Sequence, residues 1–133
     1  MKNISFMLTT DQIKNKTKTV TRRVGWLKVK PGDLLQGVVK GMGLKLGEKV
    51  EKLAVIRVVS VRREKLSAML DDAVYGSREA ASEGFGDHPR LCWPASFIKF
   101  FCESHDHCTS ETEVTRIEFE YVEEAQQGAL VGL

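Results

Sequence analysis

The stretch that decides the fold is residues 16–23, Lys16-Thr17-Lys18-Thr19-Val20-Thr21-Arg22-Arg23, which gathers four cations and three hydroxyls into eight residues. Its β-branched side chains lose rotamer freedom in a helix and fit a strand. In a strand, Thr19, Thr21 and Arg23 share one face, while Lys18 points to the other. Lys18 can therefore meet Thr21 only if the chain bends between them. We expect a junction between loop and strand here, which brings an amine, a hydroxyl and a guanidinium into one concave site.

The chain on either side of this stretch predicts several strands. Alternating apolar and polar residues over 3–8 predict a short first strand, and residues 11–15 predict a helix of one or two turns. A Pro-Gly-Asp turn precedes a strand over residues 34–40, and the glycines that follow indicate a hairpin loop. Residues 50–63 have the strongest strand pattern, with Val and Ile at positions that predict burial on both faces and a length that predicts a bulge.

The second half predicts helices followed by a last strand. Two short helices are expected over residues 67–74 and 77–83, and a clearer one over 94–103, with Pro94 in its first turn. Residues 114–122 alternate as a strand does. The alternation places three residues inward (Ile117, Phe119, Tyr121) and three outward (Arg116, Glu118, Glu120).

These elements predict one α+β domain over residues 1–122, a small mixed β-barrel closed by its terminal strands with short helices inserted around it. Residues 123–133 have little pattern and are expected to form a loose C-terminal tail. No apolar run approaches the ~20 residues that span a bilayer. Three cysteines in a chain with no export signal at its N-terminus predict reduced thiols and a cytoplasmic location.

Charge is distributed unevenly along the chain. Residues 1–65 hold 16 Lys and Arg against 5 Asp and Glu, a balance of +11, whereas residues 66–133 hold 4 against 13, a balance of −9. Such a division indicates either a basic surface for a polyanion or cations that face water along the strands.

Two short motifs resemble those of the ASCH domains, a PUA-like family linked to RNA and modified nucleosides. Residues 18–23 fit the family's Lys-x-x-Thr-x-Arg core, and Ala80-Ala81-Ser82-Glu83-Gly84-Phe85 fits its Ala-x-x-Glu-Gly-Phe segment. Where the family usually has a glycine two residues before the lysine, this chain has Lys16, in the turn that leads into the motif. The resemblance covers about residues 3–122 and implies a PUA-like pseudobarrel.

The resemblance also implies a site and an activity. In ASCH-like amidohydrolases that remove the acetyl group from N4-acetylcytidine, the residues matching Lys18, Thr21 and Glu83 are catalytic, and Arg23 and Thr19 are expected to bind the substrate. These residue types suit acyl transfer: a hydroxyl attacks the amide carbonyl, a base takes its proton and a cation stabilises the oxyanion. Thr21 is then the nucleophile. Neighbouring cations favour Lys18 as the base, whereas close pairing with Glu83 would keep Lys18 charged at the oxyanion and leave Glu83 to handle the proton; the sequence leaves that choice open.

Two further classes of function stay open. The first is a module that binds single-stranded RNA, with ribonuclease activity as in some relatives, and with Trp26 as a stacking platform. The cations expected to contact its phosphates are Lys16, Arg22, Lys28 and Lys30. The second is an accessory protein that binds another protein through its acidic half. In either case the chain is expected to need no cofactor and no membrane.

One cluster has the composition of a metal site. It is Cys102-x-x-His105-x-His107-Cys108, and thiolates and imidazoles are zinc ligands. Structural zinc sites usually take ligands in pairs from separate elements, whereas Cys102 falls on the face of a helix that is expected to pack on the core. Free cysteines and polar loop histidines are therefore expected, with no metal.

Overall fold

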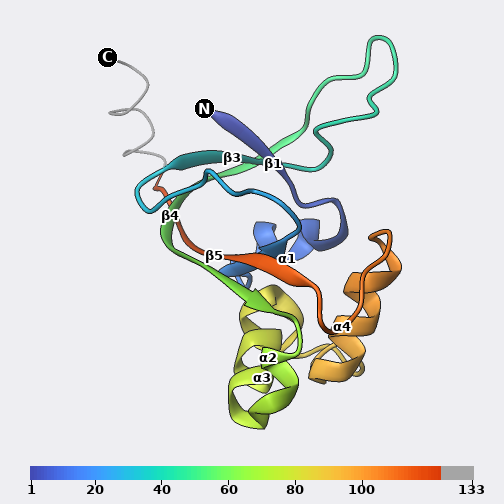
Figure 1. Cartoon of the computed structure of the whole chain (residues 1–133). Coiled ribbons are helices and arrows are strands. Elements are labelled where there is room, and N and C mark those ends of the chain that lie inside the picture. The colour runs from blue at the N-terminus through green and yellow to red at the C-terminus, as the bar shows by residue number, and fades with distance from the viewer. Residues whose placement is uncertain (124–133) are drawn as a thin grey trace.

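The structure is a computed structural model that describes residues 1–123, so the expected tail, apart from Glu123, lies outside the described residues. A curved sheet lies over a group of helices (Figure 1). The strands are β1 (Lys2–Ser5), β2 (Val20–Arg23), β3 (Leu34–Val38), β4 (Lys52–Lys65) and β5 (Glu113–Tyr121). The helices are α1 (Thr10–Lys14), α2 (Ala68–Asp71), α3 (Ala73–Ala80) and α4 (Pro94–Glu103), with a 3-10 turn at Met7–Thr9 and a π-helical turn at Ala81–Phe85.

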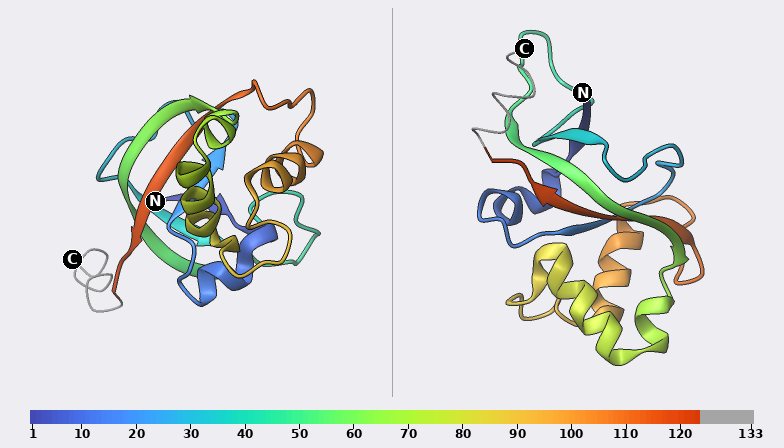
Figure 2. Two further views of the ribbon diagram at one scale, coloured as in Figure 1. Left: turned by 90° about the horizontal axis from the view of Figure 1, so that it is seen from below. Right: turned by 90° about the vertical axis from the view of Figure 1, so that its left-hand side faces the viewer.

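The five strands form one mixed sheet in the order β1-β3-β4-β5-β2, in which only the β1–β3 pair is parallel. Strand β4 pairs with β3 along its first half and with β5 along most of its length. The expected bulge is present, since the β4–β5 register shifts between Val58 and Ser60. The strand curves there, and the sheet wraps into a half-barrel (Figure 2). The predicted α+β pseudobarrel is therefore confirmed.

The expected closure by the terminal strands is wrong. β5 lies inside the sheet, between β4 and β2, so the outer strands are β1 and β2, which share no ladder. A side chain links them instead, because the Arg23 guanidinium donates to the Ser5 carbonyl over 2.6 Å. This link lies at the open side of the half-barrel.

Helix boundaries differ from the prediction in two places. Asp72 separates α2 from α3, because its carboxylate accepts from the Val74 and Tyr75 backbone N–H groups and so caps α3. The helix expected to end near Glu83 runs into the π-helical turn, where Gly84 has a φ of 104°. Nearer the N-terminus, β1 stops at Ser5 and the chain then enters the 3-10 turn, which leaves Leu8 exposed.

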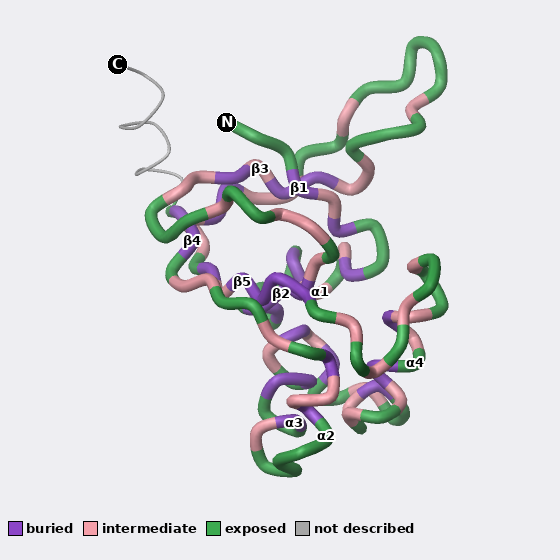
Figure 3. The backbone as a smooth tube through the Cα atoms, in the orientation of Figure 1, coloured by how far each residue is buried: buried purple, intermediate pink, exposed green. Residues whose placement is uncertain are grey.

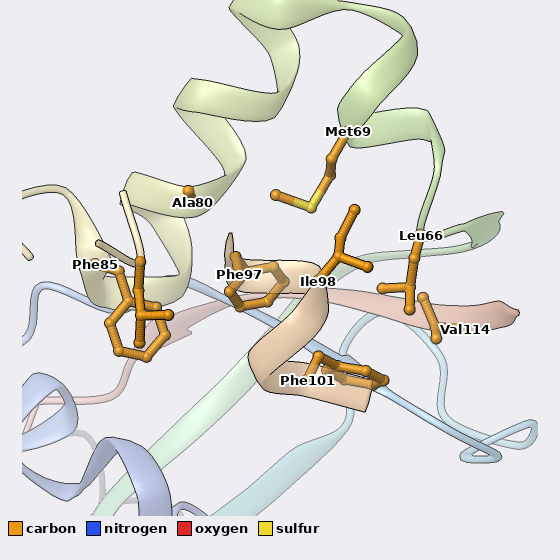
Figure 4. Packing of buried hydrophobic residues seen from close by; sticks show 9 residues of the cluster. Leu66, Met69, Ala80, Phe85, Phe97, Ile98, Phe101 and Val114 are labelled. Carbon is orange, nitrogen blue, oxygen red and sulfur yellow. The ribbon is translucent and has the colours of Figure 1, made fainter. Parts of the chain in front are cut away.

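Two hydrophobic clusters fill the molecule. The first lies among α2, α3, α4 and the start of β5, where Phe85, Phe97 and Phe101 pack with aliphatic side chains (Figure 4). The second lines the concave side of the sheet, with Phe6, Ile56 and Ile117 almost fully buried. The buried residues lie along the sheet and on the parts of the helices turned toward it (Figure 3). Burial on both faces of β4 holds only in part, because Val59 is 45% exposed at the bulge.

Part of the charge asymmetry is balanced by three ion pairs between β4 and the acidic residues of β5 and its approach. Arg57 pairs with Glu120, Arg63 with Glu113 and Lys65 with Glu111. The basic and acidic halves of the sequence thus interleave across one antiparallel pair of strands. Within residues 1–123, no helix has the length and apolar character needed to cross a membrane.

Candidate functional site

The bend expected before β2 is present and is fixed by backbone hydrogen bonds. After α1, the N–H groups of Thr17 and Lys18 both donate to the Gln12 carbonyl, at 3.0 and 3.3 Å, and the Tyr121 hydroxyl donates to the Lys18 carbonyl over 2.6 Å. Lys16 sits at the turn with a φ of 61°. This left-handed conformation favours glycine, and Lys16 adopts it despite its side chain. The bend turns the Lys18 side chain toward the buried interior.

The Glu-Gly-Phe segment lies directly against this bend. The Thr19 N–H donates to the Ser82 carbonyl over 2.8 Å, which ties the bend to the π-helical turn. A Cβ on Gly84 would lie 2.6 Å from Cγ of Gln12 and 3.4 Å from Cβ of Lys18. The close approach therefore requires glycine on both conformational and steric grounds. It sets the neighbouring Glu83 side chain against Lys18.

Lys18 and Glu83 form a buried ion pair. The Lys18 ammonium donates to Oε1 of Glu83 over 2.6 Å and to the Glu83 carbonyl oxygen over 3.0 Å, and each residue is only 3% exposed. Burial lowers the pKa of Lys18 below its usual value, although the Glu83 carboxylate opposes that shift. Arg23 and Arg22 reinforce the lowering. The amine is thus poised to release a proton more readily than an exposed lysine.

Thr21 and Arg23 stand together on one face of β2, as the strand alternation predicts. Nε of Arg23 donates to the Thr21 hydroxyl oxygen over 3.0 Å, and the guanidinium carbon lies 5.1 Å from the centre of the Phe6 ring. Burial lowers the pKa of Arg23 to about 10, with Glu83 opposing the shift. Thr21 is 3% exposed and accepts from a cation, which leaves its own hydroxyl proton for another partner.

These four side chains line one cavity of about 300 Å³. It lies at the open side of the half-barrel, between the Ser5–Thr9 segment, β2 and helix α4. Its remaining wall is rich in aromatic groups, from Phe6, Phe85, Phe97, Phe100 and Phe101. A polar, charged end and an aromatic wall suit a planar ligand that carries a polar substituent.

Apart from Arg22, the other residues expected to bind a ligand lie elsewhere. Thr19 is exposed and is not part of the cavity wall. Lys16, Lys28 and Lys30 are exposed but also lie outside that wall, and Lys30 pairs with Asp33. Trp26 is half-buried against the sheet core, with the Lys2 ammonium 4.1 Å from its ring centre.

Arg22 lines the same cavity, but it is buried and so does not belong to an exposed surface for phosphates. Its side chain is fully buried, because one nitrogen donates to Glu83 over 3.1 Å and another to Glu79 over 2.6 Å. A guanidinium enclosed in this way cannot face a polyanion in solvent. Arg116, expected to point outward, is likewise buried, because it donates to both carboxylate oxygens of Glu79.

The buried position of Glu79 predicts how stability responds to acid. Burial alone opposes its charge, but the hydrogen bonds from Arg116 and Arg22 outweigh burial and lower the Glu79 pKa from 4.5 to about 2. The stability due to this carboxylate is therefore complete above pH 4.5 and is lost as the pH falls toward 2. We expect Glu79→Gln to flatten the fall in unfolding free energy over this range, measured by urea unfolding at successive pH values. An unchanged slope would contradict the assignment, and Glu120→Gln in the exposed Arg57–Glu120 pair is the control.

The expected absence of a metal site stays a prediction. One residue of the Cys-His cluster, His105, lies at the cavity. Within residues 1–123 no group of three or more His, Cys, Asp or Glu side chains could hold a metal ion. Burial and a hydrogen bond with Cys108 raise the pKa of the Cys102 thiol to about 12, which disfavours a thiolate ligand.

His105 lines the cavity instead, a role that the sequence did not reveal. Nδ1 of His105 lies 2.8 Å from the Phe101 carbonyl oxygen, and its ring stacks on Phe101 with centres 4.2 Å apart. Because a carbonyl oxygen only accepts, Nδ1 carries the proton in this contact, and in the tautomer with that proton alone Nε2 is an acceptor. The contact forms in the turn that follows α4, where the His105 N–H donates to the Cys102 carbonyl, and the sequence pattern gives no signal for it.

Comparison with solved structures identifies the fold. The high resolution crystal structure of the ASCH domain from Lactobacillus crispatus JV V101 matches with a TM-score of 0.58 and 19% identity, over 90% of this chain and 78% of that one. The crystal structure of hypothetical protein PH0355 matches with a TM-score of 0.58 and 15% identity, over 90% of this chain and 95% of that one. The sequence matches no family model and no curated protein. These identities establish the fold alone, and the chain has the PUA-like fold of ASCH domains.

Proposed function

We propose that this chain recognises a modified nucleoside in the cavity and hydrolyses an amide on its base, as in N4-acetylcytidine. The observation that carries the proposal is the buried Lys18–Glu83 pair, which shares one cavity with the Thr21 hydroxyl and the Arg23 guanidinium. A nucleophile, a proton acceptor and a cation for the developing charge are the three groups that acyl transfer requires.

The nucleophile of the proposed reaction is the Thr21 hydroxyl. Lys18 first releases its own proton to solvent; the Thr21 oxygen then attacks the acetyl carbonyl carbon while the hydroxyl proton passes to the neutral amine of Lys18. The ammonium formed and the Arg23 guanidinium stabilise the tetrahedral oxyanion. The C–N bond then breaks, and the exocyclic nitrogen takes the proton back and leaves as the amine of cytidine. Water attacks the acetyl ester on Thr21 in the same way and releases acetate.

Lys18 is the base in this proposal, because Glu83 has a second cationic partner. When Lys18 loses its proton, the Glu83 carboxylate keeps its contact with Arg22, at 3.1 Å, and so remains balanced. The neutral amine is disfavoured only by the loss of its own contact with Glu83, while burial favours it. Glu83 therefore orients the amine through two hydrogen bonds rather than taking the proton itself.

The aromatic wall supports binding of a base rather than of a phosphate chain. Phe100 and Phe101 offer apolar surface, and Nε2 of His105 offers an acceptor for an N–H or a ribose hydroxyl. The exposed cations expected to contact RNA lie outside the cavity wall. The alternative, an RNA-binding module without hydrolysis, keeps support from Lys16, Lys28 and Lys30, which are exposed.

Salt distinguishes the two functions. We expect cytidine release from N4-acetylcytidine to change little between about 50 and 200 mM salt, since the nucleoside carries no phosphate. Binding of single-stranded RNA through the exposed lysines would weaken steeply over the same range. The experiment measures both on the same protein, with chromatographic separation of the nucleosides and fluorescence anisotropy of a labelled oligonucleotide. RNA binding that is sensitive to salt, with no cytidine released, would replace the proposed hydrolase with the binding module.

A further inference from the structure

We infer that Glu79, which does not line the cavity, is a positioning residue for the site: it holds Arg22 in place so that Glu83 stays paired with Lys18. The inference concerns the site of the proposed function and rests on that proposal for its catalytic meaning. The observation behind it is a series of ion pairs that runs from Lys18 through Glu83 and Arg22 to Glu79.

Strand register creates the need for this carboxylate. Arg22 on β2 is the direct partner of Arg116 on β5, and Arg116 is the direct partner of Arg62 on β4. Three arginines thus stand in a row across the sheet. Like charges directly opposite each other are destabilising, and two of these guanidinium groups are also buried. The positive charge of the row must therefore be balanced by carboxylates that pack against it.

Glu79 supplies the charge for the two buried arginines. Projecting from α3, it accepts from Arg22 at 2.6 Å and from Arg116 through both carboxylate oxygens, and it is 3% exposed. At the outer end of the row, Glu64 and the Tyr75 hydroxyl both contact Arg62. Glu79 is therefore the carboxylate of α3 that holds Arg22 at the inner end of the row.

Arg22 has few other constraints. Its Nε is the one buried side-chain nitrogen or oxygen in the described part of the chain that lacks a hydrogen-bond partner. Its orientation therefore depends on its two terminal nitrogens. One reaches Glu83 at 3.1 Å, and the other reaches Glu79, with the Tyr75 oxygen at 3.3 Å and Glu64 at 3.6 Å as longer contacts.

Loss of the Glu79 charge then acts on the cavity through Arg22. Around Lys18 and Glu83 the cations are Arg22, Arg23 and, beyond them, Arg116. Without Glu79, Arg22 and Arg116 repel each other, and Arg22 has Glu83 as its one close carboxylate. The Glu83 carboxylate is drawn toward Arg22 and away from Lys18. Both effects favour the neutral amine of Lys18.

The experiment compares the titration of the Lys18 amine in the unaltered chain and in the Glu79→Gln variant, by NMR of protein with labelled lysine side chains. Glu79→Gln keeps the shape of the side chain and removes its charge. We expect Lys18 to titrate at lower pH in the variant. Although the amine is then more often neutral, it loses the Glu83 contact that orients it, so we also expect kcat for N4-acetylcytidine to fall roughly tenfold with little change in KM, as when one hydrogen bond to a charged group is lost.

A matched control and a second variant keep the test decisive. Glu120→Gln removes the same charge from the exposed pair with Arg57 and should leave the Lys18 titration unchanged. If Glu79→Gln does not fold, Glu79→Asp, which keeps the charge but has a shorter reach, is expected to give a smaller shift in the same direction. A lower unfolding temperature with an unshifted Lys18 titration would show a purely structural role and overturn the inference. If no nucleoside is hydrolysed, the proposed activity fails, and the titration still decides the role of Glu79.

Discussion

Replacing Lys18 with methionine is expected to reduce amide hydrolysis by about 10³-fold or more, because the variant loses the proposed base and a cation at the oxyanion. Methionine keeps an unbranched side chain in the buried slot but leaves Glu83 with Arg22 as its remaining cationic contact. Because that contact persists, the loss of unfolding free energy should be smaller than the ~3–5 kcal/mol typical of a broken buried pair. The rate is measured by chromatography of cytidine, and stability by urea unfolding.

A double variant separates stability from chemistry. In Lys18→Met/Glu83→Gln the buried Arg22 also loses its carboxylate partner at Glu83, so the unfolding free energy should fall below that of the single variant, while hydrolysis stays as low as in the single variant. Hydrolysis that falls in step with the unfolding free energy across the parent, single and double variants would mean that Lys18 serves the fold alone. Full activity in the single variant would exclude it as the base.

Replacing Thr21 with valine is expected to reduce the rate of hydrolysis by at least about 10³-fold, since loss of an attacking group usually costs that much or more. The change keeps the volume and the β-branched shape that β2 favours. It removes the acceptor of Nε of Arg23, so the unfolding free energy should fall by about 1–3 kcal/mol. Nucleoside affinity, measured by calorimetry, should change little because the aromatic wall is intact.

The matched variant is Thr21→Ser, which keeps the hydroxyl and should retain measurable turnover. Mass spectrometry of the peptide that carries Thr21, after rapid quenching with acid, should find one added acetyl group in the parent chain and none in the valine variant. Equal turnover by the valine variant would show that water attacks directly and that Thr21 only shapes the cavity.

The local features of the site could be read from the sequence because they depend on neighbours along the chain. The bend before β2 and the pairing of Thr21 with Arg23 follow from strand alternation. The meeting of Lys18 with Glu83 came from two motifs that resemble a known family, since no periodicity links residues 65 positions apart. Pro94–Glu103 was predicted to the residue because Pro94 marks its start.

Features set by strand register could not be predicted in this way. Arg116 was expected outward by strand alternation and Arg22 by its charge, but both are buried against Glu79, which reaches them from a helix elsewhere in the chain. The order of the strands, which leaves β1 and β2 at the edges, also depends on long-range pairing. His105 was grouped with cysteines by its position in the sequence, although the turn after α4 places it against the cavity.

The measurement that tests the central claim most directly is the release of cytidine and acetate when the purified chain is incubated with N4-acetylcytidine. The account predicts equal amounts of both products, in excess of the protein present, with neither product released by Thr21→Val or Lys18→Met. A folded parent chain that releases no cytidine, or variants that release it at the parent's rate, would contradict the account.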